Sequence, residues 1–296
     1  MGKYTIQAEF VDFKDGKVQL RQQNGEEVTI PIEKLSDADR QFVQQQSKGE
    51  PVPEGPPKEL AVDLGKGVKM EMVLIPADEF KMGDDESGME SEKPVHKVNI
   101  TKPFCLGKYE VTQEQWEAVM GNNPSHSKGM KNPVEQVTWD DCQKFLVKLD
   151  AKTSGQGDKF VLPTEAQWEY ACRAGSTSKF CFGDDENQLD EYAWYDKNSG
   201  SKTHPVGEKK PNAWGLYDMH GNVWEWCQDW YGVYGTEAVT DPSGPTRPAT
   251  GSLRVIRGGG WYVPAGRCRS AGRDYDGPGG RRRDLGLRVA RVPADK

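Results

Sequence analysis

Residues 176–296 constrain the fold of this chain most, because no long helical spacing of apolar residues runs through them. They are rich in Gly, Asn, Pro and Trp, as in the segment RGGGWYVPAGRCRS at 257–270. Glycine and proline favour turns and interrupt regular elements. The chain holds 33 Gly and 19 Pro, while nine Trp, ten Tyr and nine Phe supply apolar volume. We therefore expect a loop-rich domain with an aromatic core.

Residues 1–47 have a different pattern, which is typical of a small β module. Apolar and polar residues alternate in three short runs. The dipeptides DG at 15–16 and NG at 24–25 are strong hairpin-turn signals between these runs. A short helix is expected after Ser36, which is a suitable N-cap.

Residues 48–60 contain four prolines and predict a semi-extended linker, so a second domain is expected at 61–294. This domain opens with two strands within 68–84. Three helix starts follow, each marked by a threonine with a polar residue three positions later. Such pairs can form a capping box, in which two side chains satisfy backbone N–H groups reciprocally. The pairs are Thr112 with Gln115, Thr138 with Asp141, and Thr164 with Gln167.

Eight strings in the second domain occur in a diagnostic order. They are MVLIPADEFKMGD, YEVTQEQWEAVM, PVEQVTWDDCQKF, LPTEAQWEYACRAG, NAWGLYDMHGNVWEWCQDW, RVIRGGGW, CRSAGR and LGLRVAR. Together they resemble the formylglycine-generating enzyme family, also called sulfatase-modifying factors. The resemblance implies an α+β variant of the C-type lectin fold with much irregular structure. The first module resembles the SLA1 homology domain 1, which implies a small SH3-like β-barrel.

The family resemblance also implies a chemistry, which this sequence does not support. The authentic enzymes oxidise a sulfatase cysteine to formylglycine with O₂ and a copper(I) ion held by two cysteines. Those ligands lie between the positions of Trp261 and Cys268, but no sulfur occurs at 262–267 and Val263 stands near the first ligand position. Gly260 replaces a serine. We expect no copper and no catalytic residues; the RGGGW glycines should serve close backbone approach or positive φ, with Trp261 in the core.

The resemblance pairs Cys172 with Cys268 in a disulfide, which would add about 4 kcal/mol in the chain-entropy model. The alternative is two buried free thiols. A second family disulfide would join Cys142 to position 289, which is valine here, so that bridge cannot form. Cys142 is then a buried thiol or pairs with one of the others, Cys105, Cys181 or Cys227. A copper pair formed by Cys142 and Cys227 is the least favoured alternative.

The string DMHGNVWEW resembles the calcium loop of the family. Side-chain oxygens of Asp218 and Glu225 and the carbonyls of Gly221 and Val223 are the expected ligands, since Ca²⁺ prefers oxygen. The alternative is a turn rich in Asn and Asp whose carboxylates pair with arginine. A second calcium site is a weaker expectation around residues 194–198. We interpret His220 as a turn residue.

Charge is distributed unevenly along the chain. The net charge of −7 argues against general nucleic-acid binding, but ten Arg and one Lys against four Asp give +7 from residue 251 onward. These arginines are expected to tie loops together through forked pairs with aspartates, or alternatively to bind an anionic partner. No apolar run is long enough to span a membrane.

We therefore expect a non-oxidase member of the family that binds a protein or peptide, with a sulfatase-related protein or a glycan as possible ligands. Irregular loops on a rigid frame suit binding. The candidate surface consists of Trp194, Trp214, Tyr231 and Tyr234, unless these residues belong to the core. A true formylglycine-generating oxidase and an accessory subunit of one are the alternatives. The start MGKYTIQAEF suggests a truncated N-terminus, and the expected disulfide and calcium favour an exported protein.

Overall fold

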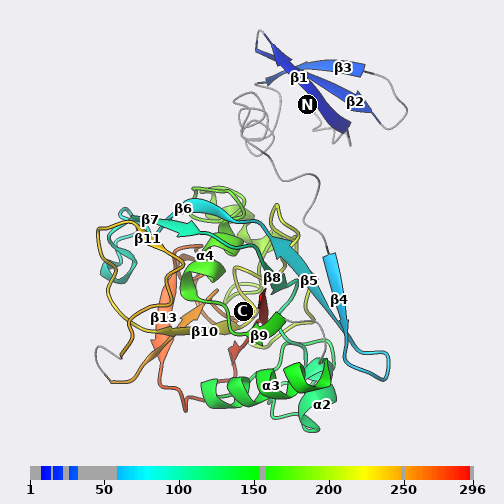
Figure 1. Cartoon of the computed structure of the whole chain (residues 1–296), viewed down its shortest axis with the longest axis vertical. Helices are drawn as coiled ribbons and strands as arrows, with labels where there is room; N and C mark the ends of the chain where they lie inside the picture. Colours follow the sequence, from blue (N-terminus) through cyan, green and yellow to red (C-terminus); the bar gives the residue numbers. More distant parts are fainter. Residues whose placement is uncertain are drawn as a thin grey trace. The chain divides into compact units, whose positions relative to one another are not determined.

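The computed structural model describes residues 8–14, 16–22, 27–32, 59–153, 158–247 and 251–293. The chain forms two compact units, Met1–Gly55 and Pro56–Lys296 (Figure 1). Each unit is described by itself below.

The first unit contains an antiparallel meander of three described strands in the order β1-β2-β3. They are β1 (Ala8–Lys14), β2 (Lys17–Gln22) and β3 (Glu27–Pro31). Gly16 has a φ of 74° in the turn between β1 and β2, which confirms the DG turn predicted there. Val18 is fully buried. The predicted NG turn and the helix expected after Ser36 lie outside the described residues.

The second unit is built on three sheets. The five-stranded sheet has the order β4-β5-β8-β15-β9, formed by Glu59–Asp63, Lys69–Ile75, Phe104–Gly107, Ala290–Pro293 and Asp158–Val161. The four-stranded sheet has the order β13-β12-β10-β14, formed by Arg273–Asp276, Arg254–Arg257, Trp224–Trp230 and Leu285–Gly286. The three-stranded sheet has the order β11-β7-β6, formed by Val239–Thr240, His96–Ile100 and Asp78–Met82.

The α-helices of the second unit begin where the sequence predicts them. They are α2 (Gln113–Met120), α3 (Trp139–Lys152) and α4 (Glu165–Arg173). All three capping boxes are present, including the one closed by the shorter side chain of Asp141. Short 3₁₀ helices lie at Glu90–Glu92, Glu186–Glu191 and Ala265–Arg267. Within the described residues, no helix combines the length and hydrophobicity that crossing a bilayer requires.

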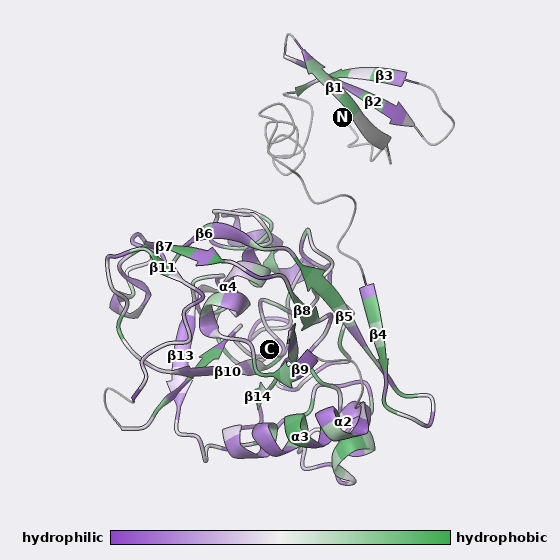
Figure 2. Cartoon of the chain, in the orientation of Figure 1, coloured by the Kyte–Doolittle hydropathy of each residue, from purple (hydrophilic) through white to green (hydrophobic). Residues whose placement is uncertain are grey.

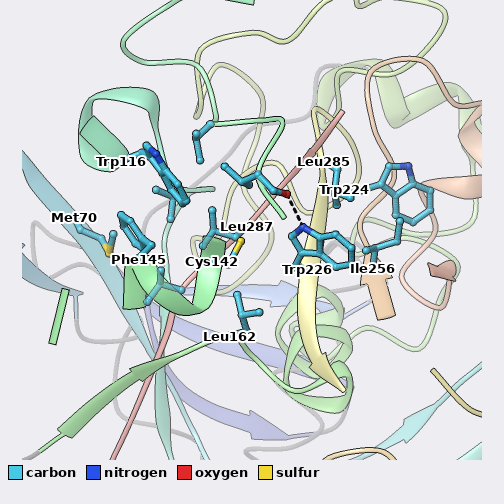
Figure 3. Packing of buried hydrophobic residues seen from close by; sticks show 14 of the residues in the cluster. Met70, Trp116, Cys142, Phe145, Leu162, Trp224, Trp226, Ile256, Leu285 and Leu287 are labelled. Atoms are coloured by element: carbon cyan, nitrogen blue, oxygen red, sulfur yellow. Dashed lines mark hydrogen bonds between the residues drawn. The ribbon is translucent and has the colours of Figure 1, made fainter. Parts of the chain in front are cut away.

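Aromatic residues fill the core of the second unit. Trp116 and Phe145 stack with ring centroids 5.0 Å apart, which joins α2 to α3. The buried indole N–H of Trp226 donates to the carbonyl of Val137 at 3.0 Å (Figure 3). Hydrophobic and hydrophilic residues alternate along α3 (Figure 2), as expected for a helix that buries one face. The predicted aromatic core in a loop-rich α+β domain is therefore confirmed.

Candidate functional site

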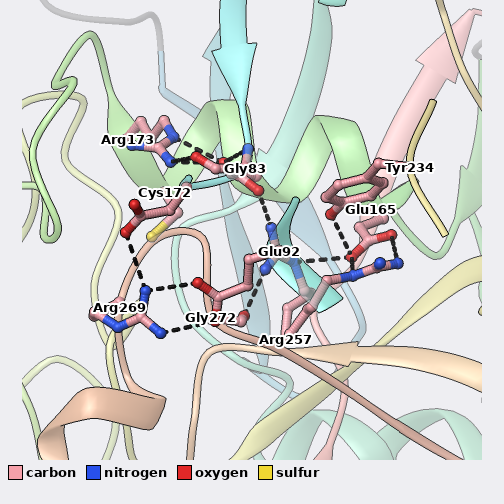
Figure 4. Close-up of polar contacts among 12 residues, drawn as sticks. Gly83, Glu92, Glu165, Cys172, Arg173, Tyr234, Arg257, Arg269 and Gly272 are labelled. Carbon is pink, nitrogen blue, oxygen red and sulfur yellow. Dashed lines mark hydrogen bonds and ion pairs between the residues drawn. The ribbon is translucent and has the colours of Figure 1, made fainter. Parts of the chain in front are cut away.

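Four buried arginines cross-link the segments of the second unit. Each forms an ion pair with a buried glutamate from a distant part of the chain, and Figure 4 shows several of these residues. The pairs are Arg257 with Glu169, Arg269 with Glu92, Arg273 with Glu165, and Arg288 with Glu225. The prediction that arginine forks tie the loops together is confirmed for these residues. The partners of these four buried arginines are glutamates, while the expected aspartate pairs occur at other arginines: Arg282 forms a forked pair with Asp284, and Arg267 pairs with Asp274.

Helix α4 holds the centre of this network. Glu169 is fully buried and accepts hydrogen bonds from Arg173, Arg257 and the backbone N–H of Gly83. Burial acts to raise the pKa of Glu169, but the guanidinium groups of Arg173 and Arg257 outweigh it and hold the pKa below its usual value. Glu169 is therefore a charged residue that fixes α4 against its neighbours.

The glycines of RGGGW follow strand β12 and allow the chain there to pass close to neighbouring residues. Gly258 and Gly259 have φ values of 99° and 80°. A Cβ atom on Gly259 would lie 2.5 Å from the sulfur of Cys268, closer than real contacts allow. The prediction that these glycines permit positive φ and close approach is confirmed, and it assigns them to the scaffold.

The segment after these glycines places Val263 inside and two aromatic residues outside. Val263 is 9% exposed and packs in the main hydrophobic cluster with Cys268. Trp261 was expected in the core, but it is only half-buried and its indole N–H donates to the carbonyl of Arg283 at 3.1 Å. That prediction was wrong because the indole N–H finds its hydrogen-bond acceptor, a backbone carbonyl, at the surface. Tyr262 is 50% exposed beside it.

All six cysteines are free in the structure, so the predicted disulfide between Cys172 and Cys268 is not confirmed. Both thiols are fully buried, which matches the alternative of two free thiols. Burial raises the pKa of Cys172 to about 12 and raises that of Cys268 above its ordinary range. The neutral ring of His220 lies between them: it is 3.9 Å from the sulfur of Cys172, and its Nδ1 is 2.8 Å from the carbonyl of Cys268.

The predicted calcium loop forms a tightly bonded turn. Asn222 has a φ of 64°, donates to Glu110 and His204, and accepts a hydrogen bond from the N–H of His204. Glu110 also accepts from the N–H of Val223 at 3.0 Å. A Cβ on Gly221 would lie 2.4 Å from the carbonyl oxygen of Trp194, so this turn packs directly against residue 194.

The oxygens of Glu225 are already used by protein donors. Oε1 accepts from Nε and Nη2 of Arg288 at 3.0 and 2.8 Å, and Oε2 accepts from Nε of Arg288 and from the indole N–H of Trp168. A carboxylate has about four lone-pair sites, and these four hydrogen bonds fill them. As the residues lie, Glu225 does not fit a calcium ligand; it fits the alternative of a carboxylate paired with arginine.

Of the two predicted carboxylate ligands, Asp218 has an oxygen without a hydrogen-bond donor among the described residues. It is buried, its Oδ2 accepts from the N–H of Gly207 at 2.8 Å, and no described residue donates a hydrogen bond to its Oδ1. Burial raises the pKa of Asp218 to about 6 and raises that of Glu110 well above its usual range. Within the described part of the chain, no three His, Cys, Asp or Glu side chains are grouped so as to hold a metal ion. Calcium at 218–225 stays a prediction, as does a second site around 194–198.

The four aromatic residues of the predicted binding surface fall into separate contacts. Trp194 stacks on His204, with ring centroids 3.7 Å apart, and Trp214 packs edge-on against Tyr170. Tyr231 and Tyr234 flank the guanidinium of Arg273, whose carbon lies 4.6 and 4.1 Å from their ring centroids. All four are partly buried. Only the two tyrosines are brought together, because they share a loop that covers β13.

An exposed surface that the predicted set missed lies at Trp261 and Tyr262. We define the arginine–aromatic surface as these two residues together with Arg281, Arg282 and Arg283. Arg282 donates to the hydroxyl of Tyr262 at 3.3 Å. Arg283 is exposed, and among the described residues none accepts a hydrogen bond from its guanidinium. The run RRR at 281–283 was a signal that could have identified this surface.

Comparison with known proteins agrees with this fold. Residues 59–293 match the family model described as the sulfatase-modifying factor enzyme 1-like domain, and residues 1–50 match the SLA1 homology domain 1. The chain therefore belongs to the sulfatase-modifying factor family, with the α+β fold predicted for it and an SLA1 homology domain 1 at its N-terminal end.

Individual relatives share most of the larger unit. The chain is 34% identical to the chaperone protein LppX of Paenibacillus barcinonensis over 76% of this chain and 90% of that protein. It is 32% identical to the formylglycine-generating enzyme of Streptomyces coelicolor over 74% and 88%, respectively. The solved structure of Treponema denticola variable protein 1 is 36% identical, with a TM-score of 0.73, over 80% of this chain and all of that one.

Proposed function

We propose that this chain is a non-oxidase member of the sulfatase-modifying factor family that binds a protein or peptide partner. Val263 carries the proposal. It is a buried hydrophobic residue in the segment where the copper enzymes are expected to supply a thiol, and residues 262–267 contain no sulfur. A valine side chain offers no lone pair to Cu(I).

The state of the remaining thiols supports the same conclusion. Burial raises the pKa of all six cysteines above the ordinary value, and five of the six are classed as buried in the fold. Copper(I) is bound by thiolates, so thiols that resist ionisation are poor ligands. The burial of these thiols therefore supports the proposal that this chain does not bind copper(I) through a pair of cysteines.

Binding would use the arginine–aromatic surface. Aromatic residues and arginine are the side chains most enriched at the centres of protein interfaces. Trp261 and Tyr262 supply partly exposed rings, and Arg283, whose guanidinium forms no hydrogen bond or ion pair with a described residue, supplies a positive charge beside them. A partner segment that carries acidic residues would match this surface, and the SLA1 homology domain 1 would add a second contact.

A copper and turnover assay tests the absence of oxidase activity. The full chain is titrated anaerobically with Cu(I), then mixed under O₂ with a sulfatase-derived cysteine peptide, and the peptide is examined for formylglycine by mass spectrometry. The Streptomyces coelicolor enzyme is the positive control. We expect no stoichiometric copper and no product from this chain. Tight binding of one copper ion together with formylglycine product would contradict the proposal and favour the alternative, a formylglycine-generating oxidase.

Fluorescence anisotropy tests the binding surface. The probes are a labelled peptide of alternating Glu and Gly and the same peptide with Lys in place of Glu. We expect the full chain to bind the acidic peptide more tightly, and Arg283→Glu to weaken that binding several-fold. Lys102→Glu is the matched control, since Lys102 is an exposed cation elsewhere on the domain. Equal binding of both peptides, or an equal effect of both substitutions, would refute a role for this surface.

A further inference from the structure

A second possible site is a cavity of about 510 Å³ where strand β10 ends. Its walls come from α4, β6, β7, β11 and β13 and from the loop at 231–245. No residue of the 257–270 segment lines it, so it is separate from the surface of the proposed function. The volume is within the range that small organic ligands occupy in proteins.

Two charged residues that line the cavity, Glu165 and Arg273, neutralise each other. The guanidinium of Arg273 donates to both oxygens of Glu165 at 2.7 Å, and the hydroxyl of Tyr234 donates to Oε1 of Glu165 at 3.1 Å. Arg273 also donates to the carbonyls of Ser91 and Gly232 at 2.9 Å. Most of its N–H groups are therefore already used, and little remains to attract an anionic ligand.

Asp229 differs from these neighbours because no ion pair joins it to a described residue, and the charges of Arg273 and Arg254 act on it only at longer range. It lines the cavity and its side chain is almost fully buried, with 3% of the residue exposed. Oδ2 accepts from the backbone N–H of Glu165 at 2.9 Å, while Oδ1 lies beside Gly244 and accepts no hydrogen bond from any other described residue. Burial, together with the charge of Glu165, raises the pKa of Asp229 to about 8. A cation that reaches a buried carboxyl group without an ion-pair partner stabilises its ionised form.

The rest of the lining is largely apolar. Met82, Val239 and Pro242 supply aliphatic surface, and the rings of Trp230 and Tyr234 also line the cavity. These two rings already stack on the guanidinium groups of Arg254 and Arg273, so the aliphatic side chains form the apolar wall for a ligand. Asp241 adds a further negative charge, and its oxygens accept from the N–H and hydroxyl of Thr101. An anionic ligand would thus face carboxylates, whereas a cation would find one free acceptor inside an apolar pocket.

We infer that this cavity binds a primary ammonium group carried on an aliphatic chain, with the nitrogen at Oδ1 of Asp229 and the chain against the apolar wall. This chemistry is shared by free alkylamines and by the lysine side chain of a peptide. The inference does not depend on the proposed function, because it requires neither the absence of copper nor the arginine–aromatic surface.

Isothermal titration calorimetry on the full chain at about pH 9 tests this inference, because the carboxyl group of Asp229, with a pKa of about 8, is then ionised and the alkylamine is still protonated. The probes are hexylammonium, 1-hexanol and hexanoate, which share an apolar chain and differ in the head group. We expect hexylammonium to bind and the other two to bind at least about tenfold more weakly, because a charged hydrogen bond is lost. Equal binding of hexylammonium and 1-hexanol, or no heat from any probe at millimolar concentration, would overturn the inference.

Two variants locate the binding. Asp229→Asn keeps an oxygen for the N–H of Glu165 and removes the negative charge, so we expect about tenfold weaker binding or more. Val239→Trp narrows the cavity without altering Asp229 and should also reduce binding. Asp196→Asn is the matched control at an exposed position. Unchanged affinity in both cavity variants would refute the assignment.

A final probe separates the two sources of the ammonium group. Nα-acetyl-lysine methylamide carries the lysine side chain without a free α-amino group. If it binds as tightly as hexylammonium, a peptide lysine is the ligand; if only hexylammonium binds, the ligand is a small amine. Binding of neither compound would refute both.

Discussion

The indole N–H of Trp168 donates to Oε2 of Glu225 at 2.6 Å, which joins helix α4 to strand β10 through two fully buried side chains. The same carboxylate holds Arg288. Glu225 therefore connects three separate parts of the chain, and this role competes with the calcium ligation expected from the sequence.

Replacing Glu225 tests which role it has. Glu225→Ala leaves Arg288 buried without its partner, so we expect a loss of about 3–5 kcal/mol in the free energy of unfolding, the same with Ca²⁺ or with a chelator. Thermal melting in both conditions measures this. A rise in the melting temperature of the parent protein in Ca²⁺, lost in the variant, would instead support the calcium site.

Gly259→Ala should destabilise the fold through a single added carbon. The new Cβ would lie 2.5 Å from the sulfur of Cys268, at a φ of 80° that side chains rarely adopt. We expect a loss of about 2–5 kcal/mol in chemical unfolding. Gly266→Ala is the matched control, because nothing lies within 4 Å of its Cβ position. Similar effects at both positions would show that the contact with Cys268 is unimportant.

Arg269→Ala should be far more damaging than loss of a surface ion pair. Arg269 donates to both oxygens of the buried Glu92 at 2.7 Å, so its removal leaves an unpaired buried carboxylate. We expect a loss of about 3–5 kcal/mol. Lys97→Ala removes an exposed pair with Glu79 and should cost less than about 1 kcal/mol. Denaturant titrations of both variants give the comparison, and comparable losses would contradict it.

The lowered pKa of Glu169 predicts a specific sensitivity to acid. A carboxylate whose pKa is depressed in the folded state contributes stability above its unfolded value, and this contribution is lost as pH falls through the folded value. Melting temperatures of the parent protein should therefore fall below about pH 4.5. Glu169→Gln should be less stable at neutral pH and show a weaker decline in acid. Parallel pH profiles would exclude Glu169 as the source.

Thiol accessibility tests the pairing of Cys172 and Cys268. If both are free and buried, a thiol reagent should modify them only after unfolding, without prior reduction. If they are bridged in exported protein, alkylation before and after reduction will differ by two groups, and Cys268→Ser will abolish the difference. The measurement is intact-protein mass spectrometry on material from reducing and oxidising compartments. The masses from both kinds of material decide between two free thiols and the disulfide that the family resemblance implies.

Local signals in the sequence identify the regular elements well. The three Thr-led capping boxes mark the starts of α2, α3 and α4 because each depends only on residues three positions apart. The glycines at 258 and 259 are similarly informative, since a tight approach excludes other residues. The absence of a thiol at 262–267 needs no structure at all.

Long-range relations could not be predicted in the same way. Glu92 and Arg269 are 177 positions apart, and neither carries a local sign of the other. Trp261 looked like a core residue by type, but a surface carbonyl accepts its N–H. Asp229 lies in the string that supplied the family resemblance, and only the fold shows that it lines a cavity and forms no ion pair with a described residue.

Strand β15, at Ala290–Pro293, lies between β8 and β9 inside the five-stranded sheet. During translation the gap between these two earlier strands stays open until residue 293 has left the ribosome. The nascent domain would then expose two unpaired strand edges for most of its synthesis, which makes them natural contacts for a chaperone. A premature stop just before residue 290 would leave that gap permanently open.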